Sequence, residues 1–233
     1  MNKIEHLPNT GFYTYYPDGP IEKSLALYQE CGNSITLYFR DGTPQQVQVP
    51  PAYPLEPYQE QFGITVSLPF RALFVQSWER GLCCLDIDSS EILWKFPKKH
   101  AYEVYAIGEF VYVHFMDDGL RKFDIRTGQC IKRFPYTTGG VCFLLPECGF
   151  FIGPVRGRYQ ILDFEFCKRY AIPKDVLNPN RRETFLIHGV KLADGQLSVC
   201  GRGDSGENAM DADCDTVKFE RQISLQAAIK PAK

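Results

Sequence analysis

The sequence predicts an all-β fold built from about five copies of one short repeat. The main observation is an internal repeat whose aspartates, Asp86, Asp124 and Asp163, lie 38 and 39 residues apart. Short β-rich runs separated by Gly- and Asp-containing turns also favour an all-β fold. Amphipathic helix periodicity is nearly absent from the sequence. With 233 residues, 44% of them hydrophobic, the chain is long enough to bury a large core.

The repeat is clearest between residues 81–96 and 119–134, which align without a gap. In both copies a glycine stands five residues before the aspartate, and a phenylalanine stands ten residues after it. A shortened third copy covers residues 159–170. The repeat therefore sets the spacing of the predicted elements along the middle of the chain.

Each repeat unit reads as four short strands. In the second unit they are predicted at 102–107, 110–115, 120–123 and 129–134, with Asp- or Gly-containing turns between them. Four strands within about 40 residues is typical of a β-propeller blade.

Fainter copies flank the clear ones. We therefore predict a small single-domain β-propeller over residues 1–233, closed by pairing of N- and C-terminal strands. Its blade-like units are expected near residues 22–50, 64–97, 102–135, 139–173 and 185–223. An open fragment of three or four blades is the competing architecture.

The segment Leu85-Asp86-Ile-Asp-Ser-Ser-Glu-Ile-Leu-Trp94-Lys-Phe96 resembles the blade motif of quinoprotein-like (PQQ-like) propellers and, more broadly, WD40-like β-propeller repeats. That motif has a Leu-Asp pair, a Thr-Gly turn and a Trp; residues 123–128 carry the same turn, whereas Ser90 and Lys132 depart from the pattern. The resemblance implies that the Trp and the turn of neighbouring blades pack together. No residue matches a quinone-binding position, so no cofactor is expected.

The motif residues are predicted to be structural. The repeat aspartates should hydrogen-bond the backbone of their turns, Trp94 should fill a gap between blades, and His114 should lie in the core. The chain has no Gly-x-Ser-x-Gly elbow, no Gly-rich phosphate loop and no pair of histidines at metal-ligand spacing. The sequence therefore predicts that the protein is not an enzyme and holds no metal.

Composition narrows the expected location and partners. The formal charge of −2 argues against a general binder of nucleic acids. The sequence has no run of 18 apolar residues, so it predicts no membrane-spanning helix. Nine cysteines form an odd set without zinc-site spacing, which favours free thiols in a reducing compartment. We therefore expect a cytoplasmic protein that contacts neither a membrane nor a nucleic acid.

The candidate partner-binding residues lie in two stretches that the repeat does not need. An acidic insert at 201–215 and an aromatic segment at 11–20 supply them: Asp204, Glu207, Asp211, Asp213, Asp215, Tyr13, Tyr15 and Tyr16. The acidic insert does not match the EF-hand calcium-loop pattern, because Thr216 and Gln222 stand where that pattern requires Gly and Glu.

A second candidate surface is basic and belongs to the two middle units. Its cations are Lys95, Lys98, Lys99, Arg121, Lys122, Arg126, Lys132 and Arg133. Opposite charges in the middle units and in the acidic insert predict a dipolar surface suited to a charged protein partner.

Together these features predict a non-catalytic protein-binding module. The finer hypothesis is a stand-alone cytosolic inhibitor, such as an immunity protein that neutralises a bacterial toxin with a basic surface. The alternative is a carbohydrate-binding or hydrolytic propeller with its site at the ring axis, where carboxylates from several blades would converge.

Overall fold

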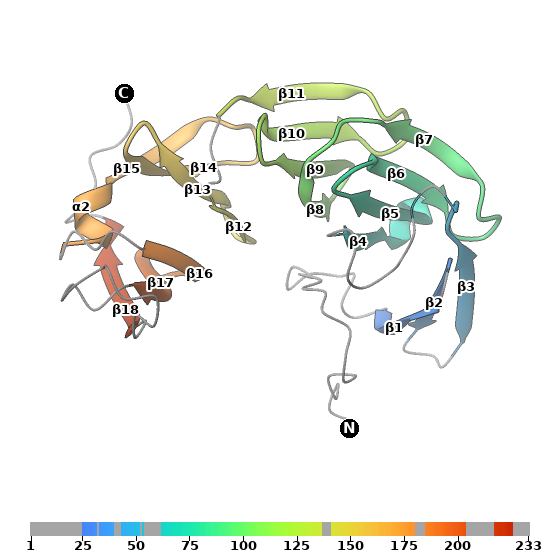
Figure 1. Cartoon of the computed structure of the whole chain (residues 1–233), viewed down its shortest axis with the longest axis horizontal. Helices are drawn as coiled ribbons and strands as arrows, with labels where there is room; N and C mark the ends of the chain where they lie inside the picture. Colours follow the sequence, from blue (N-terminus) through green and yellow to red (C-terminus); the bar gives the residue numbers. More distant parts are fainter. Residues whose placement is uncertain are drawn as a thin grey trace. The chain divides into compact units, whose positions relative to one another are not determined.

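The computed structural model describes residues 25–31, 33–39, 43–51, 53, 62–136, 141–179, 185–203 and 217–225. Nearly all of them lie in antiparallel strands or in the turns between strands (Figure 1). The chain divides into two compact units, Met1–Thr137 and Thr138–Lys233.

The first unit contains three antiparallel sheets with strands in chain order. The first sheet has β1 (Leu25–Cys31), β2 (Ser34–Phe39) and β3 (Pro44–Gln48). The second has β4 (Phe62–Ser67), β5 (Ala72–Ser77), β6 (Gly81–Asp86) and β7 (Ile92–Phe96), with a 3-10 turn η1 (Leu68–Phe70) after β4. The third has β8 (Ala101–Ile107), β9 (Phe110–Phe115), β10 (Gly119–Asp124) and β11 (Cys130–Phe134).

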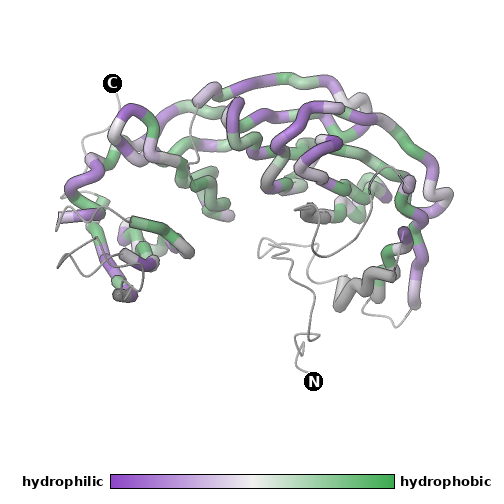
Figure 2. Tube along the Cα trace, viewed as in Figure 1, coloured by the Kyte–Doolittle hydropathy of each residue, from purple (hydrophilic) through white to green (hydrophobic). Residues whose placement is uncertain are grey.

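The strands β5 and β6 of the second sheet are buried on both faces, which explains their largely apolar sequence. Successive side chains of a strand point to opposite faces. Leu73 and Val75 of β5 accordingly join a buried cluster with residues of β2 and β3, while Phe74 joins a different cluster with residues of β8, β9 and β10. Figure 2 shows the same pattern as long hydrophobic stretches along the inner strands, with hydrophilic residues interrupting β7 and β11.

The glycine that begins each repeat copy is required by a tight contact between strands. Gly81 and Gly119 both have φ of +86°, a backbone conformation that other residues rarely adopt. A Cβ at Gly81 would collide with the carbonyl oxygen of Phe96, and one at Gly119 would collide with that of Phe134. The Gly and Phe of the repeat therefore specify one close approach between the third and fourth strands.

The second unit contains two antiparallel sheets, again in chain order. One has β12 (Val141–Leu145), β13 (Gly149–Val155), β14 (Arg158–Leu162) and β15 (Lys168–Pro173), followed by the four-residue helix α2 (Lys174–Leu177). The other has β16 (Phe185–Ala193), β17 (Gln196–Gly203) and β18 (Val217–Ser224). Phe151, Ile161, Leu197 and Val199 lie in the buried cluster that joins them.

The all-β prediction is confirmed, and the described strands form five sheets. In the described residues, the three middle sheets have four strands each, and the first and last sheets have three. The extent of a single domain over 1–233 and the closure of the ring stay predictions. Among the described residues, no helix has the length and apolar character needed to cross a bilayer.

The cysteines placed by the structure are all free thiols: Cys83, Cys84, Cys130, Cys142, Cys148, Cys167 and Cys200. Burial raises the pKa of Cys83 to about 11 and raises that of Cys84 as well, whereas Cys167 and Cys200 are exposed.

We expect brief alkylation of the native protein at pH 8 to label Cys167 and Cys200 and to spare Cys83 and Cys84. Peptide mass spectrometry measures this, and equal labelling of Cys83 before and after denaturation would contradict it.

Candidate partner-binding site

Each repeat aspartate closes its own turn. Asp124 Oδ1 accepts hydrogen bonds from the Thr127 N–H and from the Thr127 hydroxyl, both at 2.8 Å. Asp86 and Asp163 accept in the same way from the N–H groups of Ser89, at 2.7 Å, and Cys167, at 2.8 Å. Hydrogen bonding by the Thr127 N–H lowers the pKa of Asp124. The predicted structural role is confirmed: these carboxylates hold turns.

Trp94 joins the sheet β4–β7 to the sheet β8–β11. Its Nε1 donates a 2.8 Å hydrogen bond to the Ile125 carbonyl, and its ring stacks on Phe123 with centroids 6.2 Å apart. Gly128 lies against the indole, since a Cβ there would be 2.5 Å from Trp94 Cδ2. The predicted packing of Trp94 between neighbouring blades is confirmed. These motif residues fix the frame on which the surface lies.

The candidate partner-binding residues from the sequence lie outside the described residues. This holds for the acidic set Asp204, Glu207, Asp211, Asp213 and Asp215, and for the aromatic set Tyr13, Tyr15 and Tyr16. The basic middle units, by contrast, are described throughout and form a defined surface.

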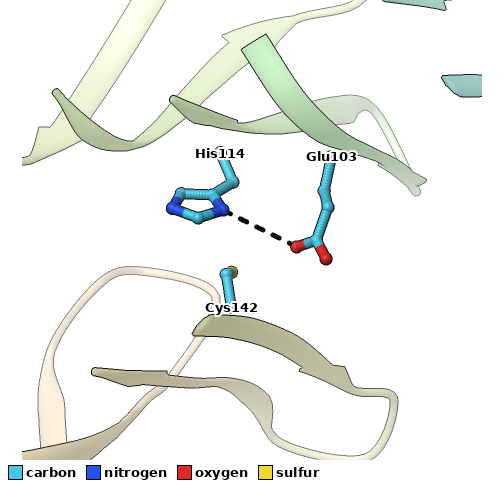
Figure 3. A group of neighbouring side chains, drawn as sticks. All are labelled: Glu103, His114 and Cys142. Carbon is cyan, nitrogen blue, oxygen red and sulfur yellow. Dashed lines mark ion pairs between the residues drawn. The ribbon is translucent and has the colours of Figure 1, made fainter. Parts of the chain in front are cut away.

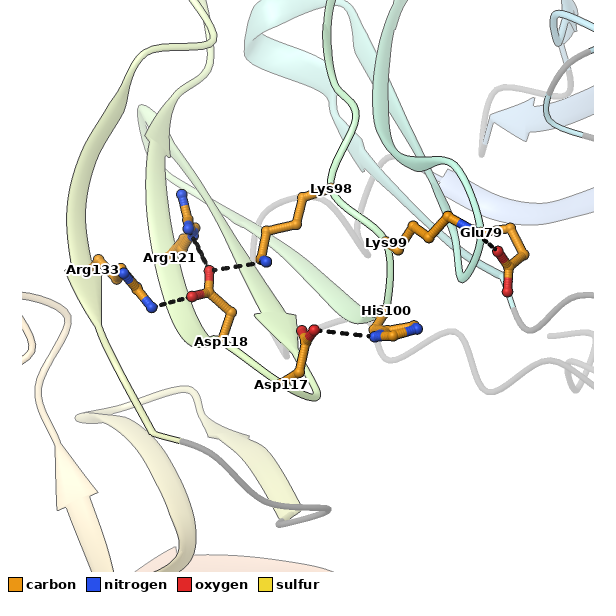
Figure 4. Close-up of polar contacts among 8 residues, drawn as sticks. All are labelled: Glu79, Lys98, Lys99, His100, Asp117, Asp118, Arg121 and Arg133. Atoms are coloured by element: carbon orange, nitrogen blue, oxygen red, sulfur yellow. Dashed lines mark hydrogen bonds and ion pairs between the residues drawn. The ribbon is translucent and has the colours of Figure 1, made fainter.

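The centre of that surface is the carboxylate of Asp118, whose side chain is only 7% exposed. It lies in the turn between β9 and β10, and three cations reach it (Figure 4). Arg121 donates through Nε at 2.6 Å, Arg133 approaches the other carboxylate oxygen, and Lys98 Nζ is 3.9 Å away. We call these four residues the Asp118 cluster. One carboxylate among three cations leaves a local excess of two positive charges.

Two weaker ion pairs continue the surface along the segment after β7. Lys99 Nζ lies 2.7 Å from Glu79, and His100 Nδ1 lies 3.2 Å from Asp117 (Figure 4). Within the cluster, the Arg133 side chain is 49% exposed, so part of its guanidinium remains accessible while one nitrogen holds Asp118. Part of the Arg133 guanidinium therefore remains available to a partner, and the Asp118 carboxylate neutralises only part of the positive charge around it.

The outer strands β7 and β11 add exposed apolar side chains to this charge. Leu93 is 48% exposed and Ile131 is 50% exposed, and the two occupy equivalent positions of the repeat. The exposed cations Lys95 and Lys132 lie beside them on the same strands. Lysines on an edge strand also discourage pairing with other sheets, which is their simplest structural role. We call the Asp118 cluster together with Leu93, Lys95, Ile131 and Lys132 the basic edge surface.

Three of the predicted cations do not belong to this surface: Lys99 pairs with Glu79, and the other two lie over aromatic rings. Lys122 is buried, with its Nζ 3.9 Å from the centroid of the Phe110 ring. Arg126 lies over the ring of Phe70 at 4.7 Å. Asp118 itself was missed as a site residue, because Asp117-Asp118-Gly119 reads from sequence only as a turn signal.

A buried histidine lies beside a partly exposed carboxylate on the sheet β8–β11. His114 is completely buried, and its Nδ1 is 3.7 Å from Glu103 Oε2 (Figure 3). Tyr105 donates a 2.9 Å hydrogen bond to the same oxygen, and the His114 ring stacks on Tyr136. The predicted core position of His114 is confirmed. Cys142, also drawn in Figure 3, belongs to the other compact unit.

Comparison with known proteins finds similar folds among solved structures only. No family model matches the chain, and no curated protein matches it significantly. Among solved structures, a chain in the S. cerevisiae complex of a Dbp5 variant with Nup159, a Gle1 variant, IP6 and ADP is 12% identical, with a TM-score of 0.56 over 91% of this chain and 58% of that one. A chain of the Mitotic Checkpoint Complex is 10% identical, with a TM-score of 0.51 over 74% and 52%.

BamB from Moraxella catarrhalis is also similar, at 12% identity and a TM-score of 0.41, over 72% of this chain and 51% of BamB. The chain thus spans about half the length of these solved chains. At such identities the likeness concerns the fold. The likeness to the two structures with TM-scores of 0.56 and 0.51 is a likeness of β-propeller fold, and the predicted fold class is confirmed.

Proposed function

We propose that this protein is a non-catalytic protein-binding module whose basic edge surface docks an acidic segment of another protein. The observation that carries the proposal is the combination on β7 and β11 of exposed apolar side chains, Leu93 and Ile131, with exposed cations. These cations are Lys95, Lys132 and Arg133, and Arg133 also reaches the shared carboxylate of Asp118. Apolar side chains supply contact area, and the surrounding cations steer an acidic partner and fix its orientation.

The rigidity of the frame supports this proposal. The Asp118 cluster is carried by β10, β11, the turn before β10 and the segment between β7 and β8, and its sheet is tied to the preceding one through Trp94. A surface that is ordered before binding loses less conformational entropy when a partner arrives. The similar solved structures are of assemblies of several proteins, which supports a binding role by analogy of fold.

The finer proposal is that the module is an inhibitor, such as an immunity protein that neutralises a bacterial toxin. It rests on the sequence: a charged, repeat-based chain without a catalytic motif. Under this proposal the acidic set Asp204, Glu207, Asp211, Asp213 and Asp215 and the aromatic set Tyr13, Tyr15 and Tyr16 form a further contact surface for a partner with a basic surface.

Charge-reversal variants test which surface binds, using a partner purified by affinity capture from the source cells. The variant Lys95→Glu/Lys132→Glu should slow association and weaken affinity at least roughly tenfold at low salt, because it reverses the charge that steers the partner. The matched control Lys191→Glu/Lys218→Glu changes two exposed lysines of the second unit and should bind normally. Surface plasmon resonance at several salt concentrations measures both.

A third variant separates the two surfaces. If Asp211→Asn/Asp213→Asn/Asp215→Asn weakens binding while Lys95→Glu/Lys132→Glu does not, the partner contacts the acidic insert and the basic edge surface is the wrong site. Equal binding by all variants would contradict both assignments.

A further inference from the structure

Leu93 and Ile131 each occupy the extra position of a β-bulge. On β7 the residues on either side of Leu93 pair with neighbouring residues of β6. On β11 the residues on either side of Ile131 pair in the same way with neighbouring residues of β10. A bulge changes the direction of a side chain at the edge of a sheet, and both of these side chains are about half-exposed.

The third repeat copy has the same bulge with a different residue in it. On β15 the residues on either side of Arg169 pair with neighbouring residues of β14. Arg169 is exposed too, and its guanidinium lies 2.5 Å from the carboxylate of Asp163, the repeat aspartate of that copy. The bulge therefore folds with a charged residue in place, so the repeat does not require an apolar side chain there. What Leu93 and Ile131 offer is contact area for a partner.

The edges of the two sheets are unsuited to an added strand. Among the described residues, β7 and β11 are the last strands of their sheets, so each has backbone groups directed away from the sheet. The bulge interrupts the even row of N–H and C=O groups that an added strand needs, and the exposed Lys95 and Lys132 also oppose edge pairing. A partner therefore has to contact this surface through side chains and not through strand pairing.

We propose that the basic edge surface binds an acidic amphipathic helix, whose apolar stripe packs on Leu93 and Ile131 and whose carboxylates face Lys95, Lys132 and Arg133. This inference rests on the proposed function and names the kind of segment that docks. A helix satisfies its backbone hydrogen bonds internally, so it can dock on an edge that is closed to strand addition. Its apolar residues, three and four positions apart, form one stripe bordered by acidic residues, which complements exposed apolar side chains bordered by cations.

Two isomeric peptides test the kind of segment. Both are fluorescein-labelled chains of about 18 residues, made of leucine, alanine and glutamate with the same composition and charge. Leucine recurs every three or four positions in one peptide and every second position in the other. In fluorescence polarisation with the full chain at low salt, the helix-patterned peptide should bind at least roughly tenfold more tightly. Equal binding of the two peptides, preference for the strand-patterned one, or no binding of either would overturn the proposal.

The variant Leu93→Arg/Ile131→Arg separates apolar contact from charge. It places at both bulges the residue that the third copy already has, so the chain should fold, which circular dichroism checks. A segment held by charge alone would bind this variant more tightly, because two cations are added. We expect the helix-patterned peptide to bind it at least roughly tenfold more weakly, since apolar contact area is lost. Leu93→Ser/Ile131→Ser, which adds no charge, should also weaken binding.

Arg169→Ser is the matched control, because it changes the equivalent bulge of the third copy and should bind like the native chain. Unchanged or tighter binding of the peptide by Leu93→Arg/Ile131→Arg overturns the proposal. If Lys95→Glu/Lys132→Glu weakens binding of the captured partner while Leu93→Arg/Ile131→Arg does not, the proposed function stands and only the helix inference fails. If Lys95→Glu/Lys132→Glu leaves the captured partner bound, both fail.

Discussion

Replacing Trp94 with alanine should lower the free energy of unfolding by about 3 kcal/mol, because it removes a large aromatic side chain from between two sheets. The indole contacts Phe123 and Gly128 and donates a hydrogen bond to the Ile125 carbonyl. Trp94→Phe keeps most of the packing and loses the hydrogen bond, so it should cost only about 1 kcal/mol. Urea denaturation followed by circular dichroism measures both changes.

The contact with Gly128 supplies an internal control for this prediction. Gly128→Ala should destabilise the native chain, because the residue has φ of +68° and its new Cβ would lie against the indole. In the Trp94→Ala background the same substitution should cost less, since the steric part of the penalty is gone. Additive losses in the two variants would contradict the proposed contact, and so would a Trp94→Ala protein as stable as the native one.

Replacing Asp118 with asparagine should cost about 2 kcal/mol of stability, because it leaves Lys98, Arg121 and Arg133 together without their shared carboxylate. Part of the loss should be recovered at about 1 M salt, where repulsion among the partly exposed cations is screened. Thermal denaturation at low and high salt measures this.

Asp117→Asn is the matched control for that change. Asp117 is its sequence neighbour, is half-exposed and pairs with His100 at the surface, so its loss should change stability by less than about 0.5 kcal/mol. If the two variants behave alike, or if salt does not reduce the effect of Asp118→Asn, the Asp118 cluster is not the electrostatic centre described above.

The fold could be predicted well because its determinants are local and repeated. The Asp of each copy accepts from backbone amides within four residues, and in the two clear copies the Gly and Phe meet across two paired strands. Such contacts recur at a fixed spacing, so an internal alignment reveals them. The first and last sheets lack clear copies of the motif, and in the described residues they have three strands each.

The candidate sites depend on contacts between distant segments, which spacing does not reveal. Lys98 and Arg133 lie 20 and 15 residues from Asp118 in sequence. The pairing of β10 with β11 brings Arg133 to Asp118, and Lys98 reaches it from the segment between β7 and β8. Lys122 reads as a surface cation, yet the aromatic rings of Phe110 and Tyr112 cover it.

Site-specific photo-crosslinking tests the central claim, a protein-binding surface on β7 and β11, most directly. A photoreactive amino acid would replace Leu93 or Ile131 on that surface, or Gln196 at an exposed position of the second unit as the control. We predict crosslinks to the captured partner from positions 93 and 131 and none from position 196. A partner that is retained by the chain but crosslinks from neither position 93 nor position 131 would contradict the account.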